Sequence, residues 1–141
     1  MKILQSLLIL ILFTACNVKV SPIEYGQDSC SSCKMGIVDQ KHASQLVTQK
    51  GKNYKFDAIE CMVSYLKKDN VQNTDYAYIL VADLLNPGEL IQAEKASFII
   101  SKNIPSPMGA FLSATKNKQQ ALELTKEFTG EVLTFEEIQN K

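Results

Sequence analysis

Sulfur-bearing side chains are concentrated in one short segment of the sequence. Cys30, Cys33 and Met35 supply two thiols and a thioether. Thiolates and thioethers are soft ligands, which select Cu(I) over hard cations. On an extended strand Cys33 and Met35 would project from the same face, because side chains two residues apart share a face. Two sulfur atoms could then bind one ion.

Three further residues could complete such a site. Met108 lies in a loop bounded by proline and glycine, where it is poorly placed for core packing, so we consider it a ligand. His42 is the only imidazole, and its polar surroundings favour an exposed position in a turn over a ligand role. Cys61 precedes Met62, which lies on the apolar face of an expected helix. This position favours a place in the core over a ligand role for Cys61.

The Cys30-x-x-Cys33 pair has other possible roles. In an oxidising compartment such a pair is often a structural disulfide. A thioredoxin-like redox pair should open a helix, whereas here β-branched residues and a glycine follow. Zinc held by Cys30, Cys33, Cys61 and His42 is possible by count, but it leaves Met35 without a role. We therefore favour copper.

Composition excludes several classes of function. The 141 residues contain no Arg, and 15 Lys against 15 acidic residues give a net charge of zero. A nucleic-acid-binding protein needs a basic face, so we expect no nucleic-acid partner. A single His leaves little material for a Ser-His-Asp triad, and we expect no enzymatic activity. The 45% hydrophobic content is that of a globular protein.

The N-terminus has the pattern of a bacterial lipoprotein signal. Lys2 precedes an apolar run of about 11 residues, too short for a membrane span of roughly 20. The run ends in Phe-Thr-Ala before Cys16, and we expect cleavage there and lipidation of Cys16 by acyl chains such as palmitate. Residues 1–15 are then the signal peptide. Residues 16–28 lack periodicity and are expected to form a lipidated tether.

Residues 29–85 contain the elements of a first small module. Strands are expected at 34–38, 45–48 and 53–56, the first two as a hairpin, and a fourth at 76–82. Asp57 and Glu60 have capping-box spacing at the start of a helix. The apolar face of that helix comprises Ile59, Met62, Val63 and Leu66.

Residues 86–141 repeat this order of elements. A turn at 86–88 serves as the linker, and strands are expected at 96–100, 110–114 and 132–133. Asn117 begins a helix that ends before Gly130, and Thr134 with Glu137 forms another capping box. We therefore expect an α+β fold of two similar ββαβ-type modules. Each is too small for a large core of its own, so the two should pack together.

Four motifs follow one another along the chain. They are Cys30-x-x-Cys33-x-Met35-x-Ile37, Phe56-Asp57 leading to Cys61-Met62 and Tyr65-Leu66, Pro107-Met108-Gly109, and Gly130-x-x-Leu133-x-Phe135-x-Glu137. In this order they resemble the motifs of the NosL family, whose members are membrane-anchored accessory lipoproteins of nitrous oxide reductase maturation. Lys34 departs from the family pattern, in which glycine is common at that position.

The resemblance implies a Cu(I)-binding metallochaperone. Its partners would be copper, nitrous oxide reductase and an ABC-type maturation complex. The implied ligands are Cys33 and Met35, with Met108 or His42 as the third and Cys30 as a spare thiol for capture or handover. We expect the protein in the bacterial cell envelope, lipid-anchored and facing the periplasm. Asn17 favours the outer membrane, because an Asp there would suggest inner-membrane retention. The alternative is an envelope thiol–disulfide redox lipoprotein that uses Cys30 and Cys33.

Overall fold

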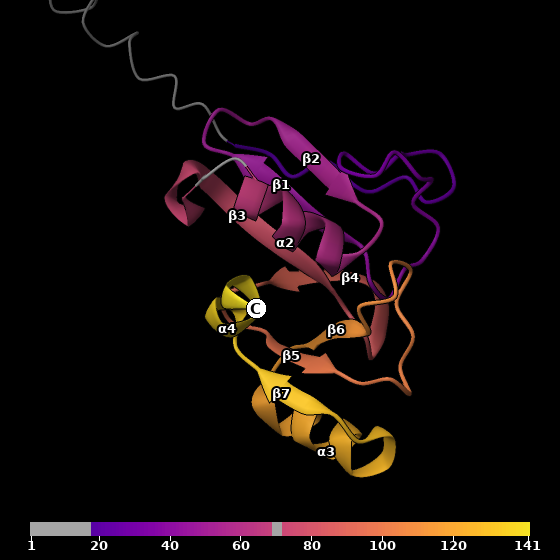
Figure 1. Cartoon of the computed structure of the whole chain (residues 1–141). Coiled ribbons are helices and arrows are strands. Elements are labelled where there is room, and N and C mark those ends of the chain that lie inside the picture. The colour runs from indigo at the N-terminus through magenta and orange to yellow at the C-terminus, as the bar shows by residue number, and fades with distance from the viewer. Residues whose placement is uncertain (1–17, 69–71) are drawn as a thin grey trace, which may run out of the picture.

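The described part of the chain forms two antiparallel sheets and three α-helices (Figure 1). The structure is a computed structural model that describes residues 18–68 and 72–141. The expected signal peptide, 1–15, and the expected lipidation residue, Cys16, lie outside these residues. Among the described residues, no helix has the length and apolar character needed to cross a membrane.

The first sheet has the order β2-β1-β3-β4. Helix α2 (Ile59–Lys68) packs beside it, and its buried face includes the four apolar residues expected from the sequence. Lys67 and Lys68 lie in its last turn, where cations are favourable to the helix dipole. The four strands are β1 (Ser44–Thr48), β2 (Asn53–Phe56), β3 (Tyr76–Asp83) and β4 (Asn86–Gln92).

Strand β4 was not expected from the sequence. The turn predicted as a linker at Asn86–Gly88 is instead the beginning of this strand, and Leu90 pairs with Ala82 of β3. A proline such as Pro87 can be accommodated in an edge strand, because its missing N–H need not face a neighbouring strand. The chain turns at residues 84–85, just before the predicted turn. The first sheet therefore extends into the region assigned to the second module.

The second sheet has the order β6-β5-β7, and helix α3 lies on its outer side (Figure 1). Asn117 caps α3 by accepting a hydrogen bond from the Gln120 N–H, and Thr134 and Glu137 form the expected capping box of α4. A short 3₁₀ helix, η2 (Asn73–Asp75), precedes β3. The remaining elements are β5 (Ser97–Ile100), β6 (Leu112–Thr115), α3 (Lys118–Phe128), β7 (Glu131–Leu133) and α4 (Phe135–Asn140).

A single hydrophobic core joins the two halves. It includes Leu46 and Met62 from the first half together with Phe98 and Phe135 from the second. The rings of Phe98 and Phe135 stack with centroids 5.9 Å apart. The Leu84 N–H donates to the carbonyl oxygen of Ala114 across the halves, 2.8 Å away. The expected α+β fold, built from two small packed units, is confirmed.

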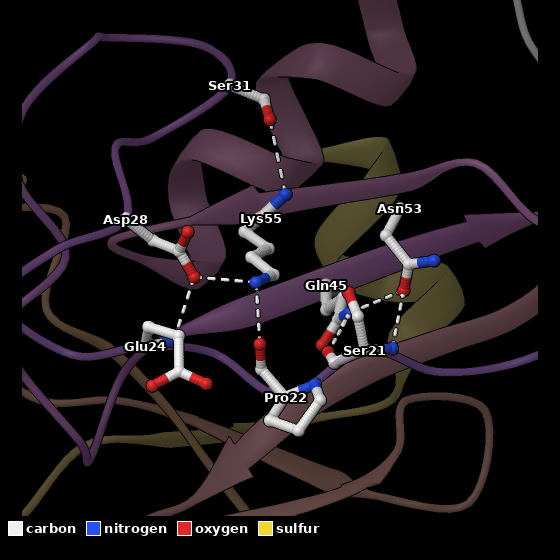
Figure 2. A network of polar contacts seen from close by, with 8 residues as sticks. All are labelled: Ser21, Pro22, Glu24, Asp28, Ser31, Gln45, Asn53 and Lys55. Carbon is white, nitrogen blue, oxygen red and sulfur yellow. Dashed lines mark hydrogen bonds and ion pairs between the residues drawn. The ribbon is translucent and has the colours of Figure 1, made fainter.

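Residues 18–28, which we expected to form a tether, lie against the first sheet (Figure 2). We call this segment the N-terminal strap. The Ser21 N–H donates to Asn53 Oδ1 at 3.0 Å. Lys55 Nζ donates to the Pro22 carbonyl oxygen and pairs with Asp28 Oδ2 at 2.6 Å. The bond from Lys55 holds the pKa of Asp28 below its ordinary value. Polar contacts thus fix a segment that has no helix or strand of its own.

The strap also sets the position of the cysteine-bearing loop that follows it. The Gly26 N–H donates to the Ile37 carbonyl oxygen at 2.8 Å, and the Ile37 N–H donates to that of Asp28 at 2.9 Å. Both ends of the intervening loop are therefore held together beside the strap.

Candidate metal centre

The loop of residues 29–37 is closed by its own backbone. Ser29 and Gly36 form an isolated bridge, and the Cys30 N–H donates to the Met35 carbonyl oxygen at 2.7 Å. Inside the loop, the Lys34 N–H donates to the carbonyl oxygen of Cys30 at 3.1 Å. The Cys33 N–H points at the Cys30 sulfur, 3.5 Å away. An N–H directed at a thiol sulfur stabilises the thiolate form that binds metals.

The strand expected at 34–38 is not formed. Lys34 has φ of 69°, in the left-handed region, and the chain reverses there instead of continuing extended. This conformation favours glycine, because it brings the Cβ of other residues too close to backbone atoms. The Lys34 side chain makes a local hydrogen bond in this conformation, because its Nζ donates to the Ser31 carbonyl oxygen at 2.9 Å. The same-face argument for Cys33 and Met35, which assumed a strand, therefore does not hold.

Contacts with the end of β2 bring the loop to a second cysteine-bearing segment. The Ser31 N–H donates to the Lys55 carbonyl oxygen at 2.7 Å, and the Lys55 N–H donates to Ser31 Oγ at 3.1 Å. Asp57 comes two residues after Lys55, and Cys61 lies in the first turn of α2. The loop thiols consequently face the junction between β2 and α2.

Four donor atoms meet at this junction. The sulfurs of Cys30, Cys33 and Cys61 and a carboxylate oxygen of Asp57 all lie within 4.8 Å of one another. Cys30, Cys61 and Asp57 are buried, and Cys33 is partly exposed. All three thiols are free. We call these four residues the thiol cluster. Tetrahedral zinc with bonds of about 2.3 Å would place sulfurs about 3.8 Å apart, so only a small contraction would be needed.

Two thiols of the cluster, Cys33 and Cys61, have raised pKa values, which favour their protonated form in the absence of metal. Burial raises the pKa of Cys33, and its hydrogen bonds with Cys30 and Asp57 act in the same direction. Burial raises the pKa of Cys61 far above its ordinary value, and a hydrogen bond with Asp57 raises it further. A bound metal must therefore displace protons from these sulfurs.

The structure separates the ligands expected from the sequence into three groups. Cys30 and Cys33 meet in the thiol cluster. Met35 and Met108 are 53% and 43% exposed, so both thioethers face solvent. The loop of Met108 is tied to α2 by a hydrogen bond from Ser106 Oγ to Glu60, the residue before Cys61.

His42 is not exposed in a turn, as we expected, but buried. Only 3% of its surface is accessible. Its Nδ1 lies 3.0 Å from Asp39 Oδ2, and its Nε2 lies 3.1 Å from Ser113 Oγ of β6. Both ring nitrogens thus have partners within the protein, and the histidine links the two halves.

Asp57 and Cys61 complete the cluster, although the sequence favours other roles for them. We expected Asp57 to cap the helix and Cys61 to lie in the core. Helix α2 instead begins at Ile59, and Asp57 Oδ1 accepts a hydrogen bond from the Cys33 thiol at 3.4 Å. The available signal was the spacing Asp-x-x-x-Cys at a strand-to-helix junction, read together with the earlier Cys-x-x-Cys.

Comparison with models of known protein families assigns the chain to one family. The family model NosL matches residues 22–141. The chain belongs to the NosL family. The match spans the strap from residue 22 onward, both sheets and the three α-helices of the described residues. The resemblance inferred from the four sequence motifs is thereby confirmed, and so is the expectation that the protein is not an enzyme.

A solved NosL structure has the same fold. The crystal structure of the copper chaperone NosL from Shewanella denitrificans superposes with a TM-score of 0.72 at 19% sequence identity. The match covers 85% of this chain and 95% of the other. A comparison with curated proteins finds no match.

Proposed function

We propose that this NosL protein is a membrane-anchored Cu(I)-binding metallochaperone of the cell envelope that delivers copper for the assembly of nitrous oxide reductase. The observation that carries the proposal is the partly exposed Cys33 thiol, which lies two residues from the exposed thioether of Met35. Sulfur ligands of this kind select Cu(I). A copper chaperone with the same fold supports the same cargo.

Cys33, Met35 and Met108 form the proposed copper ligand set. Exposed methionines are uncommon, because the side chain is apolar and is usually buried. Here two of them face solvent, at 53% and 43% exposure, whereas Met62 is fully buried in the core. Met108 is a better third ligand than His42, because both nitrogens of that ring already have partners.

Exposed ligands suit transfer of the ion to a partner protein. An acceptor ligand can approach Cys33 or Met35 from solvent, and the ion can pass through a complex in which both proteins bind it. Cys30 lies behind Cys33 and is buried, so it serves as a spare thiol on the protein side. The nitrous oxide reductase client and its ABC-type maturation complex belong to the proposal through the family resemblance.

In the sequence, the proposed lipidation residue Cys16 comes two positions before the strap. The described chain begins at residue 18, and the Lys19 carbonyl oxygen already accepts a hydrogen bond from Asn53 Nδ2 at 3.1 Å. Acylation of Cys16 would therefore hold the first sheet near the membrane surface instead of at the end of a long tether. We place the protein on the periplasmic side, at the outer membrane.

A thiol–disulfide redox protein is the alternative function. A redox nucleophile needs a lowered thiol pKa. Burial raises the pKa of Cys33, and the hydrogen bond to Asp57 raises it further. These effects disfavour Cys33 as the nucleophile of disulfide exchange.

A Cu(I) competition titration of the reduced chain from residue 17 tests the proposal. We expect one-to-one binding that Cys33→Ser abolishes, and that Met35→Ala or Met108→Ala weakens by on the order of tenfold. Met62→Leu is the matched control, because it changes a buried methionine. Unchanged affinity in Cys33→Ser would overturn the proposal.

A further inference from the structure

We propose that the thiol cluster is a second metal site, in which Cys30, Cys33, Asp57 and Cys61 bind one Zn²⁺ ion. This site goes beyond the copper cargo site of the proposed function. It differs from that site in its donors, since it contains a carboxylate oxygen and no thioether. A carboxylate oxygen is a common zinc ligand and a poor match for Cu(I).

The donor geometry fits a closed tetrahedral site. The four ligand atoms lie within 4.8 Å of one another, close enough to bind one ion after a small contraction. Structural zinc sites have four protein ligands, with sulfur and oxygen bonds of about 2.3 and 2.0–2.2 Å. The Cys30-x-x-Cys33 spacing is typical of one half of such a site. The zinc set considered from the sequence contained His42, and the structure replaces it with Asp57.

The backbone of the loop is arranged to support thiolates. The Cys33 N–H already points at the Cys30 sulfur, 3.5 Å away. Three thiolates and one carboxylate around Zn²⁺ give a net charge of −2, the same as in a four-cysteine zinc site. Hydrogen bonds from backbone N–H groups stabilise such charge. The Cys33 thiol proton, which is now donated to Asp57 Oδ1, would be released when both residues become ligands.

The site joins two segments that are otherwise connected by hydrogen bonds, such as those between Ser31 and Lys55. The loop of residues 29–37 contains one isolated bridge and no helix or strand. Asp57 and Cys61 belong to the junction of β2 and α2. An ion bound by ligands from both segments would fix the loop to the sheet and helix. Because three of the four ligands are buried, the bound ion would be largely shielded from solvent.

Cys33 belongs to both ligand sets, and this links the two metals. Zinc in the thiol cluster occupies the thiolate that the copper set needs. Zn²⁺ should therefore weaken Cu(I) binding, whereas Met35 and Met108 contribute to Cu(I) binding alone.

The test is a Zn²⁺ competition titration of the full-length reduced protein in detergent, with Co²⁺ substitution to report tetrahedral geometry. We expect one-to-one binding, a tetrahedral Co²⁺ spectrum with thiolate charge transfer, and a midpoint of thermal unfolding raised by on the order of 10 °C at a hundredfold excess of Zn²⁺ over Kd. Cys61→Ser should abolish tight binding, and Asp57→Asn should weaken it by roughly 10- to 100-fold.

Three control variants are matched to these changes. Met35→Ala and Met108→Ala should leave Zn²⁺ affinity unchanged while weakening Cu(I) binding. Cys16→Ser changes the one cysteine that is not a proposed metal ligand, so it should leave both affinities unchanged. Thermal unfolding of metal-free Cys61→Ser establishes that the variant folds. Absence of Zn²⁺ binding, or binding that survives Cys61→Ser, overturns the zinc site and leaves the copper proposal standing. Zn²⁺ binding without Cu(I) binding overturns the copper proposal instead.

Discussion

The Cys33 thiol lies 3.4 Å from Asp57 Oδ1, although the two residues are 24 positions apart. In the metal-free protein the thiol donates this hydrogen bond, which adds to the Ser31–Lys55 hydrogen bonds that hold the loop to the junction of β2 and α2. When the thiol loses its proton, the hydrogen bond is lost, and both the Cys33 sulfur and the Asp57 oxygen become available to bind a metal ion. The same contact therefore keeps the metal-free loop in position and prepares the donors for an ion.

The raised thiol pKa values predict a loss of stability at alkaline pH. The folded-state pKa of Cys61 lies above its ordinary value of 9.0, because burial disfavours the thiolate. A group of this kind stabilises the folded state fully below its unfolded pKa, and the contribution is lost as pH rises toward the folded pKa. We expect the free energy of unfolding of the metal-free reduced protein to fall above about pH 9, as measured by urea denaturation.

The variant Cys61→Ser isolates this effect. It removes one buried thiol, so its unfolding free energy should depend less on pH above 9.0 than that of the wild type. Equal pH dependence in the two proteins would show that the Cys61 thiol does not titrate with unfolding.

Lys34→Gly should preserve or increase stability. Lys34 has φ of 69°, and glycine adopts this conformation at lower cost than lysine. The exposed bond from Lys34 Nζ to the Ser31 carbonyl oxygen is lost in the variant, which offsets part of the gain. We expect a net change between 0 and about 1 kcal/mol in favour of the variant. Urea denaturation measures it, and a clear loss of stability would contradict the conformational argument.

The sequence predicts most of the fold correctly because periodicity and capping are local signals. The apolar face of α2 and the capping boxes of the second half depend on residues three or four positions apart. Strand β4 carries no such signal. Its first residues, Asn86, Pro87 and Gly88, are typical of a turn, and only pairing with β3 makes them a strand.

The candidate site is predicted only in part for the same reason. Cys30 and Cys33 are recognisable as a pair from their spacing. The role of Asp57 depends on hydrogen bonds between Ser31 and Lys55, which bring the loop to the end of β2. The burial of His42 depends on Ser113, 71 residues away. Spacing along the chain contains no information on either contact.

His42→Asn should destabilise the protein without changing its metal affinity. The buried ring lies within hydrogen-bond distance of Asp39 and Ser113, and Ser113 is itself fully buried. Loss of a buried partner costs about 1–3 kcal/mol. Chemical denaturation should show this loss, and Cu(I) and Zn²⁺ titrations should match the wild type. A weaker Cu(I) affinity with unchanged stability would restore His42 as the third copper ligand.

Lys55→Met should release the N-terminal strap. Lys55 Nζ is the shared partner of the Pro22 carbonyl oxygen and of Asp28, and both lose it in the variant (Figure 2). Methionine keeps the apolar part of the side chain, so the change reports the polar contacts. We expect a loss of about 1–3 kcal/mol in unfolding free energy and faster proteolysis within residues 18–28.

Two comparisons make the strap prediction specific. Lys50→Met changes an exposed lysine of the β1–β2 turn and should leave proteolysis of the strap unchanged. Acidification of the wild type should reproduce part of the Lys55→Met effect. The pKa of Asp28 is lowered from 3.8, mainly by its bond with Lys55, so its contribution is present above pH 3.8 and is lost as pH falls further. Strap proteolysis by an acid-active protease should therefore accelerate below that pH in the wild type and change less in Lys55→Met. Equal acceleration in both proteins would show that the Asp28–Lys55 pair does not hold the strap.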